Sequence, residues 1–242
     1  MARFYPTCRH CPYRIHSPYA IASSLGCANR APVAVSTDII KYESKYIDVE
    51  LRIPVLSSSE YSYAVNKLNQ SIRNDIIEFK EQMEAAAVKA AQEAQKTGKE
   101  YTRYVISTIY EVTFNKNAVV SISIIYYEFI EGKNYYIKTS YNYNLNTGQP
   151  LSLKNLFMPG VDYISLINRE IREELAQNKE KYFPGALQKF KGISEDQPFY
   201  IDSDSLNIYF GFHQIAPTAL QIPIITIPYS ELGSALKPVF LS

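Results

Sequence analysis

The sequence predicts an α+β fold: an antiparallel β-sheet backed by two amphipathic helices and preceded by an extended N-terminal arm. Apolar residues alternate with polar ones over 104–145, which is typical of half-buried strands. Two other stretches carry apolar residues at spacings of three and four, which is typical of helices with one buried face. Residues 199–229 are rich in β-branched and aromatic residues and predict short buried strands.

The composition narrows the class of protein. Of the 242 residues 46% are hydrophobic and 20% charged, so the chain can bury a core. The net charge of +1 argues against a nucleic-acid partner. No apolar run reaches the ~20 residues of a membrane span, and the first 36 residues do not resemble a secretory signal. The 21 Tyr residues suit a sheet with one exposed face and also adhesive surfaces.

Residues 1–36 differ from the rest of the chain. They contain all three cysteines and four arginines, and no Asp or Glu. We therefore expect a separate arm over 1–36, held down by other parts of the structure, and a folded domain over 37–242 with halves at 37–100 and 101–242.

The first half of the domain predicts one strand and one long helix. Ile47 to Val55 alternate, and Pro54 marks the end of this strand or an edge position. Ser57–Ser59 are candidate N-caps for a helix that ends at Gly98.

The second half predicts a meander of strands over 104–114, 119–130 and 135–145, with turns between them. A second helix follows, with Leu166, Ile167, Ile171 and Leu175 facing inward. Three short strands over 199–229 are expected to form a central piece of the sheet, buried on both faces. A short helix over 229–236 ends the chain.

Several motifs occur in an order that resembles a known family. Tyr141 to Phe157, Phe199-Tyr200-Ile201, Ile208-Tyr209-Phe210 and Ile227-Pro228-Tyr229 are similar to motifs of RsiV-type domains. Those domains form the extracellular part of a lysozyme-sensing anti-sigma factor and the N-terminal part of the deacetylase PdaC. The resemblance covers 38–238 and implies an α+β fold.

Two motifs depart from the family pattern. The Gly-Gly-Ala-His loop is absent, and residues 128–134 stand in its place. The Tyr-Glu-Ile-Ala-Pro motif becomes His213-Gln214-Ile215-Ala216-Pro217. The resemblance implies a binding module for lysozyme or cell-wall glycan.

The residues themselves favour no reaction centre. The patterns Gly-x-Ser-x-Gly and His-Glu-x-x-His are absent. We interpret His213 as a hydrogen-bonded structural residue in an apolar strand, and both Asp202 with Asp204 and Glu195 with Asp196 as turn residues. We therefore expect no enzyme, no catalytic residue, no cofactor and no metal site.

The cysteines of the arm leave four interpretations open. Cys8, Cys11 and Cys27, with His10 and His16, are residue types that bind zinc, but a second Cys or His pair at the usual spacing is missing. A redox Cys-x-x-Cys and a reduced, inert arm are two further possibilities. Disulfide bonding is favoured, and because the number of cysteines is odd, one thiol stays free or pairs with another chain.

The main functional hypothesis is a non-enzymatic structural protein of a bacterial cell or spore surface. It would assemble into a homo-oligomer, filament or layer through residues 1–36, locked by intermolecular disulfides of Cys8, Cys11 and Cys27. Apolar arm residues would dock on a neighbour's sheet edge: Ile15, Tyr19, Ile21, Leu25, Val33 and Val35. The alternative is the binding module for lysozyme or peptidoglycan.

Overall fold

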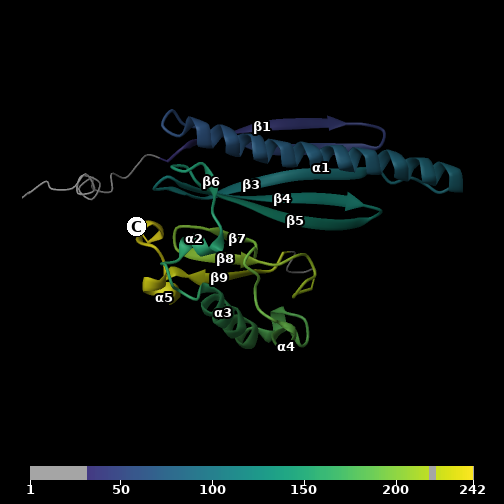
Figure 1. The fold of residues 1–242 in the computed structure, drawn as a ribbon. Helices are drawn as coiled ribbons and strands as arrows, with labels where there is room; N and C mark the ends of the chain where they lie inside the picture. Colours follow the sequence, from purple (N-terminus) through teal and green to yellow (C-terminus); the bar gives the residue numbers. More distant parts are fainter. Residues whose placement is uncertain (1–31, 218–221, 242) are drawn as a thin grey trace, which may run out of the picture.

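The structure, a computed structural model, describes residues 32–217 and 222–241, and it has the expected α+β fold (Figure 1). A six-stranded sheet has the order β1-β2-β3-β4-β5-β6. All neighbouring strands are antiparallel except β2 and β3, which are parallel. Its strands are β1 (Ala34–Glu43), β2 (Ile47–Ser57), β3 (Tyr104–Lys116), β4 (Val119–Ile130), β5 (Lys133–Asn144) and β6 (Gln149–Pro150).

Helix α1 (Ser62–Thr97) carries the chain from β2 to the parallel strand β3 and covers one face of the sheet. The predicted long helix is confirmed, with Leu68, Ile72 and Ile76 fully buried. The N-cap is Tyr61, which makes no side-chain cap bond, instead of one of Ser57–Ser59. Gly98, at φ +67°, ends the helix in the left-handed conformation that favours glycine.

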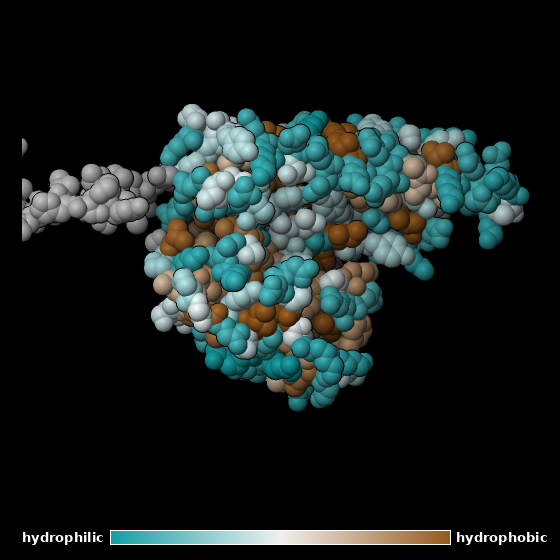
Figure 2. Space-filling view, viewed as in Figure 1, coloured by the Kyte–Doolittle hydropathy of each residue, from teal (hydrophilic) through white to brown (hydrophobic). Residues whose placement is uncertain are grey.

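The far end of α1 has little to pack against. Its last buried residue is Ala87, and residues 88–97 are exposed or half-buried. This end of the helix runs past the ends of the strands in Figure 1 and is mostly hydrophilic in Figure 2.

The predicted alternation in β2 holds up to Pro54. Ile47, Val49, Leu51 and Ile53 are buried, but beyond Pro54 it is Leu56, and not Val55, that is buried. Pro54 lies inside the strand, paired with Thr37 of β1, at a point where β2 no longer pairs with β3.

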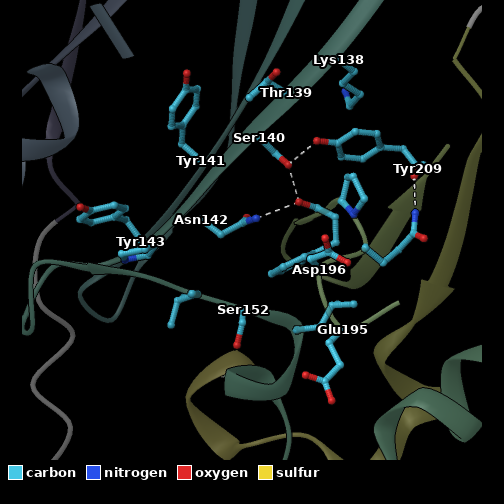
Figure 3. A pocket seen from close by; sticks show the side chains of 16 residues that line it. Lys138, Thr139, Ser140, Tyr141, Asn142, Tyr143, Ser152, Glu195, Asp196 and Tyr209 are labelled. Carbon is cyan, nitrogen blue, oxygen red and sulfur yellow. Dashed lines mark hydrogen bonds between the residues drawn. The ribbon is translucent and has the colours of Figure 1, made fainter. Parts of the chain in front are cut away.

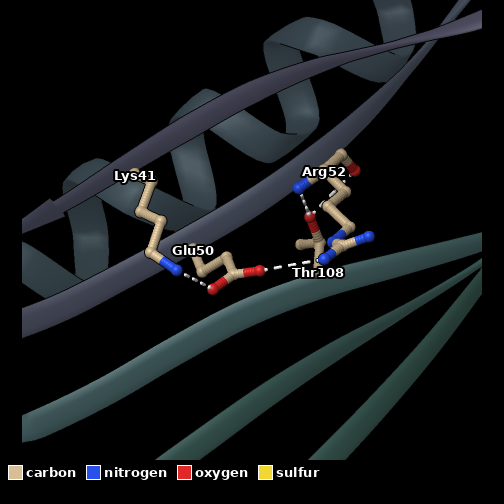
Figure 4. A network of polar contacts seen from close by, with 4 residues as sticks. All are labelled: Lys41, Glu50, Arg52 and Thr108. Carbon is tan, nitrogen blue, oxygen red and sulfur yellow. Dashed lines mark hydrogen bonds and ion pairs between the residues drawn. The ribbon is translucent and has the colours of Figure 1, made fainter.

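The polar face of β1–β3 lies opposite α1. There Glu50 binds Lys41 at 2.7 Å and Arg52 at 3.1 Å (Figure 4). Thr108 lies on the other, buried face, where it pairs with Leu51, and its hydroxyl donates to the Arg52 carbonyl of the parallel partner strand at 3.0 Å (Figure 4).

Residues 199–229 form a sheet of their own and not a central piece of the large one. It consists of β7 (Phe199–Ile201), β8 (Ser205–Tyr209) and β9 (Ile224–Pro228), with β8 in the middle. The burial predicted for both faces is confirmed for β8, which is buried along its whole length. This sheet lies between the six-stranded sheet and helix α3 (Tyr163–Gln177) (Figure 1).

Short elements connect these layers. They are α2 (Leu153–Leu156), α4 (Ala186–Lys189) and α5 (Tyr229–Leu232), with 3-10 turns at Lys179–Lys181, Gly233–Ala235 and Pro238–Phe240. One hydrophobic core lies beneath α1, and a second is shared by β7–β9 and α3. No helix in the described ranges is long and apolar enough to cross a membrane.

Only the last residues of the predicted arm lie in the described part of the chain. β1 begins at Ala34, before the expected domain boundary at 37, and pairs with β2 of the same chain. Val33 is 6% exposed and exchanges two hydrogen bonds with the Asn115 side chain, and Val35 lies on β1. These two docking candidates therefore pack within their own domain. The other candidates lie outside the described residues: Cys8, Cys11, Cys27, Ile15, Tyr19, Ile21 and Leu25.

Candidate functional site

An open cleft of about 440 Å³ follows the outer edge of β5, where the two sheets meet (Figure 3). Side chains from both faces of β5 line it, because the cleft wraps around the edge of the strand. The opposite wall comes from the segment before β7 and from β8. The lining residues are Lys138–Tyr143, Pro150–Leu153, Glu195–Phe199 and Tyr209.

A buried polar network fixes this edge against the second sheet. The Asn142 side chain donates to the Phe199 carbonyl at 2.8 Å and accepts from the Ser121 hydroxyl at 2.7 Å. The Ser140 hydroxyl donates to the same Phe199 carbonyl. Each buried group therefore has a partner, and burial then costs little free energy. The network fixes the position of β5 and therefore the shape of the cleft.

Main-chain groups of β5 point into the cleft. The Asn142 carbonyl accepts from the Leu151 N–H at 2.8 Å, on the side away from β4. In an antiparallel strand, every second residue directs its N–H and C=O to the same side. The main-chain groups of Ser140 and Lys138 therefore also point away from β4. β6 pairs only with Tyr143 and Asn144, so no strand in the described ranges pairs with β5 at 138 and 140.

Lys138 supplies a cation to the cleft. Its ammonium lies 4.6 Å from the ring centroid of Tyr200 and 5.8 Å from that of Tyr209. Burial lowers the pKa of Lys138, and the charge of Glu111 opposes this only in part. Among the described residues, no carboxylate lies within ion-pair distance of this ammonium. An anion in the cleft would therefore meet an ammonium group that has no direct ion-pair partner among the described residues.

Tyr209 adds an aromatic wall with a polar tip. Its hydroxyl lies 2.8 Å from the Ser140 hydroxyl, and its carbonyl accepts from the Gln197 side chain at 2.8 Å. Burial raises the pKa of Tyr209, so the phenol stays protonated at neutral pH.

Two carboxylates mark the opposite side of the cleft. Glu195 and Asp196 are both exposed and precede β7. The hydrogen bond from Ser194 holds the pKa of Asp196 below its usual value, so this carboxylate is ionised at neutral pH. The cleft thus combines one cation, two anions, aromatic rings and open main-chain groups.

The structure shows where His213 and Asp202, two residues singled out in the sequence, lie. His213 lies in a turn at φ +61° and not in a strand, since β8 ends at Tyr209; its ring packs on Phe183 and Phe212. The predicted Asp202 turn is confirmed, because its carboxylate accepts from the N–H groups of Asp204 and Ser205. None of these residues lines the cleft.

The sequence did not identify the cleft as a site. Glu195 and Asp196 form the predicted turn, which the Gln197 N–H closes on the Ser194 carbonyl at 3.2 Å, and they also line the cleft. Lys138 and Ser140 were not singled out, and Tyr209 was noted only as part of the Ile208-Tyr209-Phe210 motif. The available signal was the strand pattern itself, since Lys138, Ser140 and Asn142 give β5 a polar face that points toward the second sheet. Across the described residues, no group of three or more His, Cys, Asp or Glu could hold a metal ion.

Two family models match the chain. Residues 40–133 match the family described as "Deacetylase PdaC", and residues 154–230 match "Protein of unknown function (DUF3298)". These matches support the PdaC part of the resemblance. An assignment to the RsiV type is not established by them.

Two curated proteins are similar to the chain. Peptidoglycan-N-acetylmuramic acid deacetylase PdaC of Bacillus subtilis is 25% identical over 212 residues, which cover 84% of this chain and 44% of that protein. An esterase of Mycobacterium tuberculosis is 32% identical over 96 residues, which cover 37% of this chain and 41% of that protein. The chain thus spans less than half the length of these relatives.

Two solved structures share the fold. A DUF3298 family member from Bacteroides fragilis has a TM-score of 0.67 at 17% identity, over 88% of this chain and 97% of that one. A DUF3298 family protein from Pseudomonas aeruginosa has a TM-score of 0.60 at 16% identity, over 87% of this chain and 97% of that one.

The comparisons correct the main functional hypothesis. The prediction of a self-assembling, filament-forming structural protein is wrong, because the chain is similar to a protein named as a peptidoglycan deacetylase. The prediction that the protein is no enzyme is corrected as well, because both curated relatives are named as enzymes. The intermolecular disulfides have no support, since all three cysteines lie outside the described residues.

Proposed function

We propose that this chain acts at the bacterial cell wall and binds peptidoglycan in the cleft along β5. The observation that carries the proposal is the lining of this cleft, which combines tyrosine rings, hydroxyl and amide side chains, and charges of both signs. Ligand sites of this kind orient a ligand with a few convergent polar groups on an otherwise apolar wall. Aromatic rings with a polar tip offer a face to sugar rings and a donor to their hydroxyls.

The comparisons support the cell wall as the place of action. The Bacillus subtilis relative, which matches 84% of this chain, is named as a peptidoglycan-N-acetylmuramic acid deacetylase. A protein with this function would work outside the cytoplasm, at the cell surface. That location agrees with the extracellular or surface location expected from the sequence.

The test uses the full chain and purified, protein-free peptidoglycan sacculi in a sedimentation assay. Thr139 lines the cleft, so Thr139→Trp should fill it and reduce the bound fraction at least fivefold. Ile137→Trp is the matched control, because Ile137 is 51% exposed on the same face of β5 but outside the lining. Equal binding by both variants and the original chain would contradict the proposal.

Two more specific functions, lysozyme binding and deacetylation, are tested in the same assay. The RsiV-type resemblance makes lysozyme a second candidate ligand, so hen lysozyme is offered in place of sacculi. Acetate release from the sacculi is measured in parallel, because one relative is named as a deacetylase. Lysozyme binding that Thr139→Trp leaves unchanged would place that partner on another surface.

A further inference from the structure

The edge of β5 favours one part of peptidoglycan over the other, and this inference rests on the proposed function. We propose that the cleft binds the peptide portion of the cell wall, as an extended chain added along β5 with a carboxylate at Lys138 and an amine at Glu195 and Asp196. The glycan strand is then held at the protein only through the peptide that is attached to it.

The first support is the pairing state of the strand edge. The outward main-chain groups of Lys138 and Ser140 line the cleft, and no strand in the described ranges pairs with them. An exposed sheet edge accepts an extended peptide through main-chain hydrogen bonds. Amides recur along a peptide, whereas a sugar with an acetamido group offers only one. A peptide can therefore use both positions at once.

The second support is the length of the open edge. From Lys138 to Asn142 a strand rises roughly 14 Å, at about 3.4 Å for each residue. The edge is closed at one end, where the Leu151 N–H donates to the Asn142 carbonyl. A short peptide of a few residues fits this length, which is the size of the peptides that cross-link peptidoglycan.

The third support is the distribution of charge. The Lys138 ammonium packs on Tyr200 and Tyr209, and among the described residues no carboxylate is within ion-pair distance of it. Glu195 and Asp196 lie in the same cleft, before β7. A neutral glycan offers no opposite charge to any of these three groups, whereas cell-wall peptides carry free carboxylates and a diamino acid.

The first experiment compares two soluble probes by isothermal titration with the full chain. One is a muramyl-peptide fragment with its peptide intact. The other is the same glycan after an amidase has removed the peptide and the lactyl carboxylate that this cleavage leaves has been converted to a neutral amide. We expect the intact fragment to bind at least tenfold more tightly. Equal affinity would overturn the peptide inference and leave the proposed function standing, whereas binding of neither probe would remove both.

The second experiment tests the charged groups at the two ends of the proposed peptide site, which are Lys138 at one end and Glu195 with Asp196 at the other. Lys138→Met keeps an apolar stem over the tyrosines and removes the cation, and we expect at least a tenfold loss of affinity for the intact fragment. Lys133→Met is the matched control, because Lys133 is exposed on the same strand and lies outside the cleft. Acetylating the amine of the fragment should weaken binding to the original chain, and should have little effect once Glu195→Gln and Asp196→Asn are combined.

The third experiment tests strand addition itself. Hydrogen exchange at the N–H groups of Lys138 and Ser140 should slow at least tenfold when the intact fragment is bound. N-methylation of the amides of the fragment should abolish this protection. Unchanged exchange at both positions, together with tight binding, would show that the peptide contacts side chains only and would overturn the strand-addition model.

Discussion

The Asn142 side chain donates to the Phe199 carbonyl at 2.8 Å, and this contact links the two sheets of the molecule. Asn142 lies on β5 and Phe199 begins β7, 57 residues later in the chain. The Ser140 hydroxyl reaches the same carbonyl, so one main-chain oxygen accepts from two side chains of the strand that borders the cleft. The position of the cleft therefore depends on this junction.

Removing the Asn142 amide should destabilise the fold. Asn142→Ala leaves the Ser121 hydroxyl without its acceptor and removes one donor from the Phe199 carbonyl, both in a buried setting. We expect a loss of about 1–3 kcal/mol in the free energy of unfolding, measured with urea. Asn134→Ala, at the exposed start of the same strand, should change it by less than about 0.5 kcal/mol. Equal effects at both positions would contradict the structural role of the junction.

Glu128 should make stability depend on pH. Burial raises the pKa of Glu128, and no ion pair involving it is found among the described residues. As the pH rises above the ordinary carboxyl pKa of 4.5, Glu128 therefore loses its proton in the unfolded chain before it does so in the folded chain. Above that pH the folded state is destabilised relative to the unfolded state.

The free energy of unfolding of Glu128→Gln and of the original chain is measured between about pH 4 and about pH 7. This range begins near the usual pKa of a carboxyl group, at about 4. The variant should be the more stable at pH 7, and its advantage should disappear as pH falls through the raised pKa toward 4. Glu131→Gln, in the exposed loop that follows β4, is the control and should show no such trend. An advantage of Glu128→Gln that stays constant with pH would rule out this origin.

Gly192 should tolerate a side chain poorly. It has φ +112°, and a Cβ there would lie 3.0 Å from the Asn168 side-chain nitrogen. Asn168 also accepts from the Ile193 N–H at 2.9 Å, so it is not free to move away. Gly98 has a positive φ as well, but a Cβ there would meet nothing within 4 Å.

The two alanine variants separate strain from crowding. Gly98→Ala should cost about 1–2 kcal/mol, the usual penalty of the left-handed conformation. Gly192→Ala should cost at least ~1 kcal/mol more, since crowding adds to the strain. Thermal and urea unfolding measure both. A Gly192→Ala variant no less stable than Gly98→Ala would show that Asn168 moves aside at little cost.

Most of the fold could be predicted from the sequence, because local patterns set it. The spacing of Leu68, Ile72 and Ile76 indicates α1, and the alternation through 104–145 indicates β3–β5. The exceptions depend on tertiary contacts. No local pattern indicates that Phe199–Ile201 pairs with β8 and that β7, β8 and β9 form a second sheet.

Most of the candidate site could not be predicted from the sequence, because it too depends on tertiary contacts. Glu195 and Asp196 look like any polar turn until β5 is placed beside them. The open edge of β5 follows from where β6 stops pairing, and no residue pattern within Lys133–Asn144 reveals that. The same absence of local signal explains the wrong strand assignment of His213, whose apolar neighbours Phe212 and Ile215 lie in a turn.

The overhanging end of α1 gives the molecule a place where probes can be attached. Beyond Ala87 the helix buries no residue, and in the described part of the chain the ion pair of Lys96 is with Glu93 of its own last turns. A dye or an affinity tag at Lys96 would therefore disturb neither core, and it would stand apart from β5. Its rotational freedom would report how fast the helix tip unwinds while the rest of the domain stays folded.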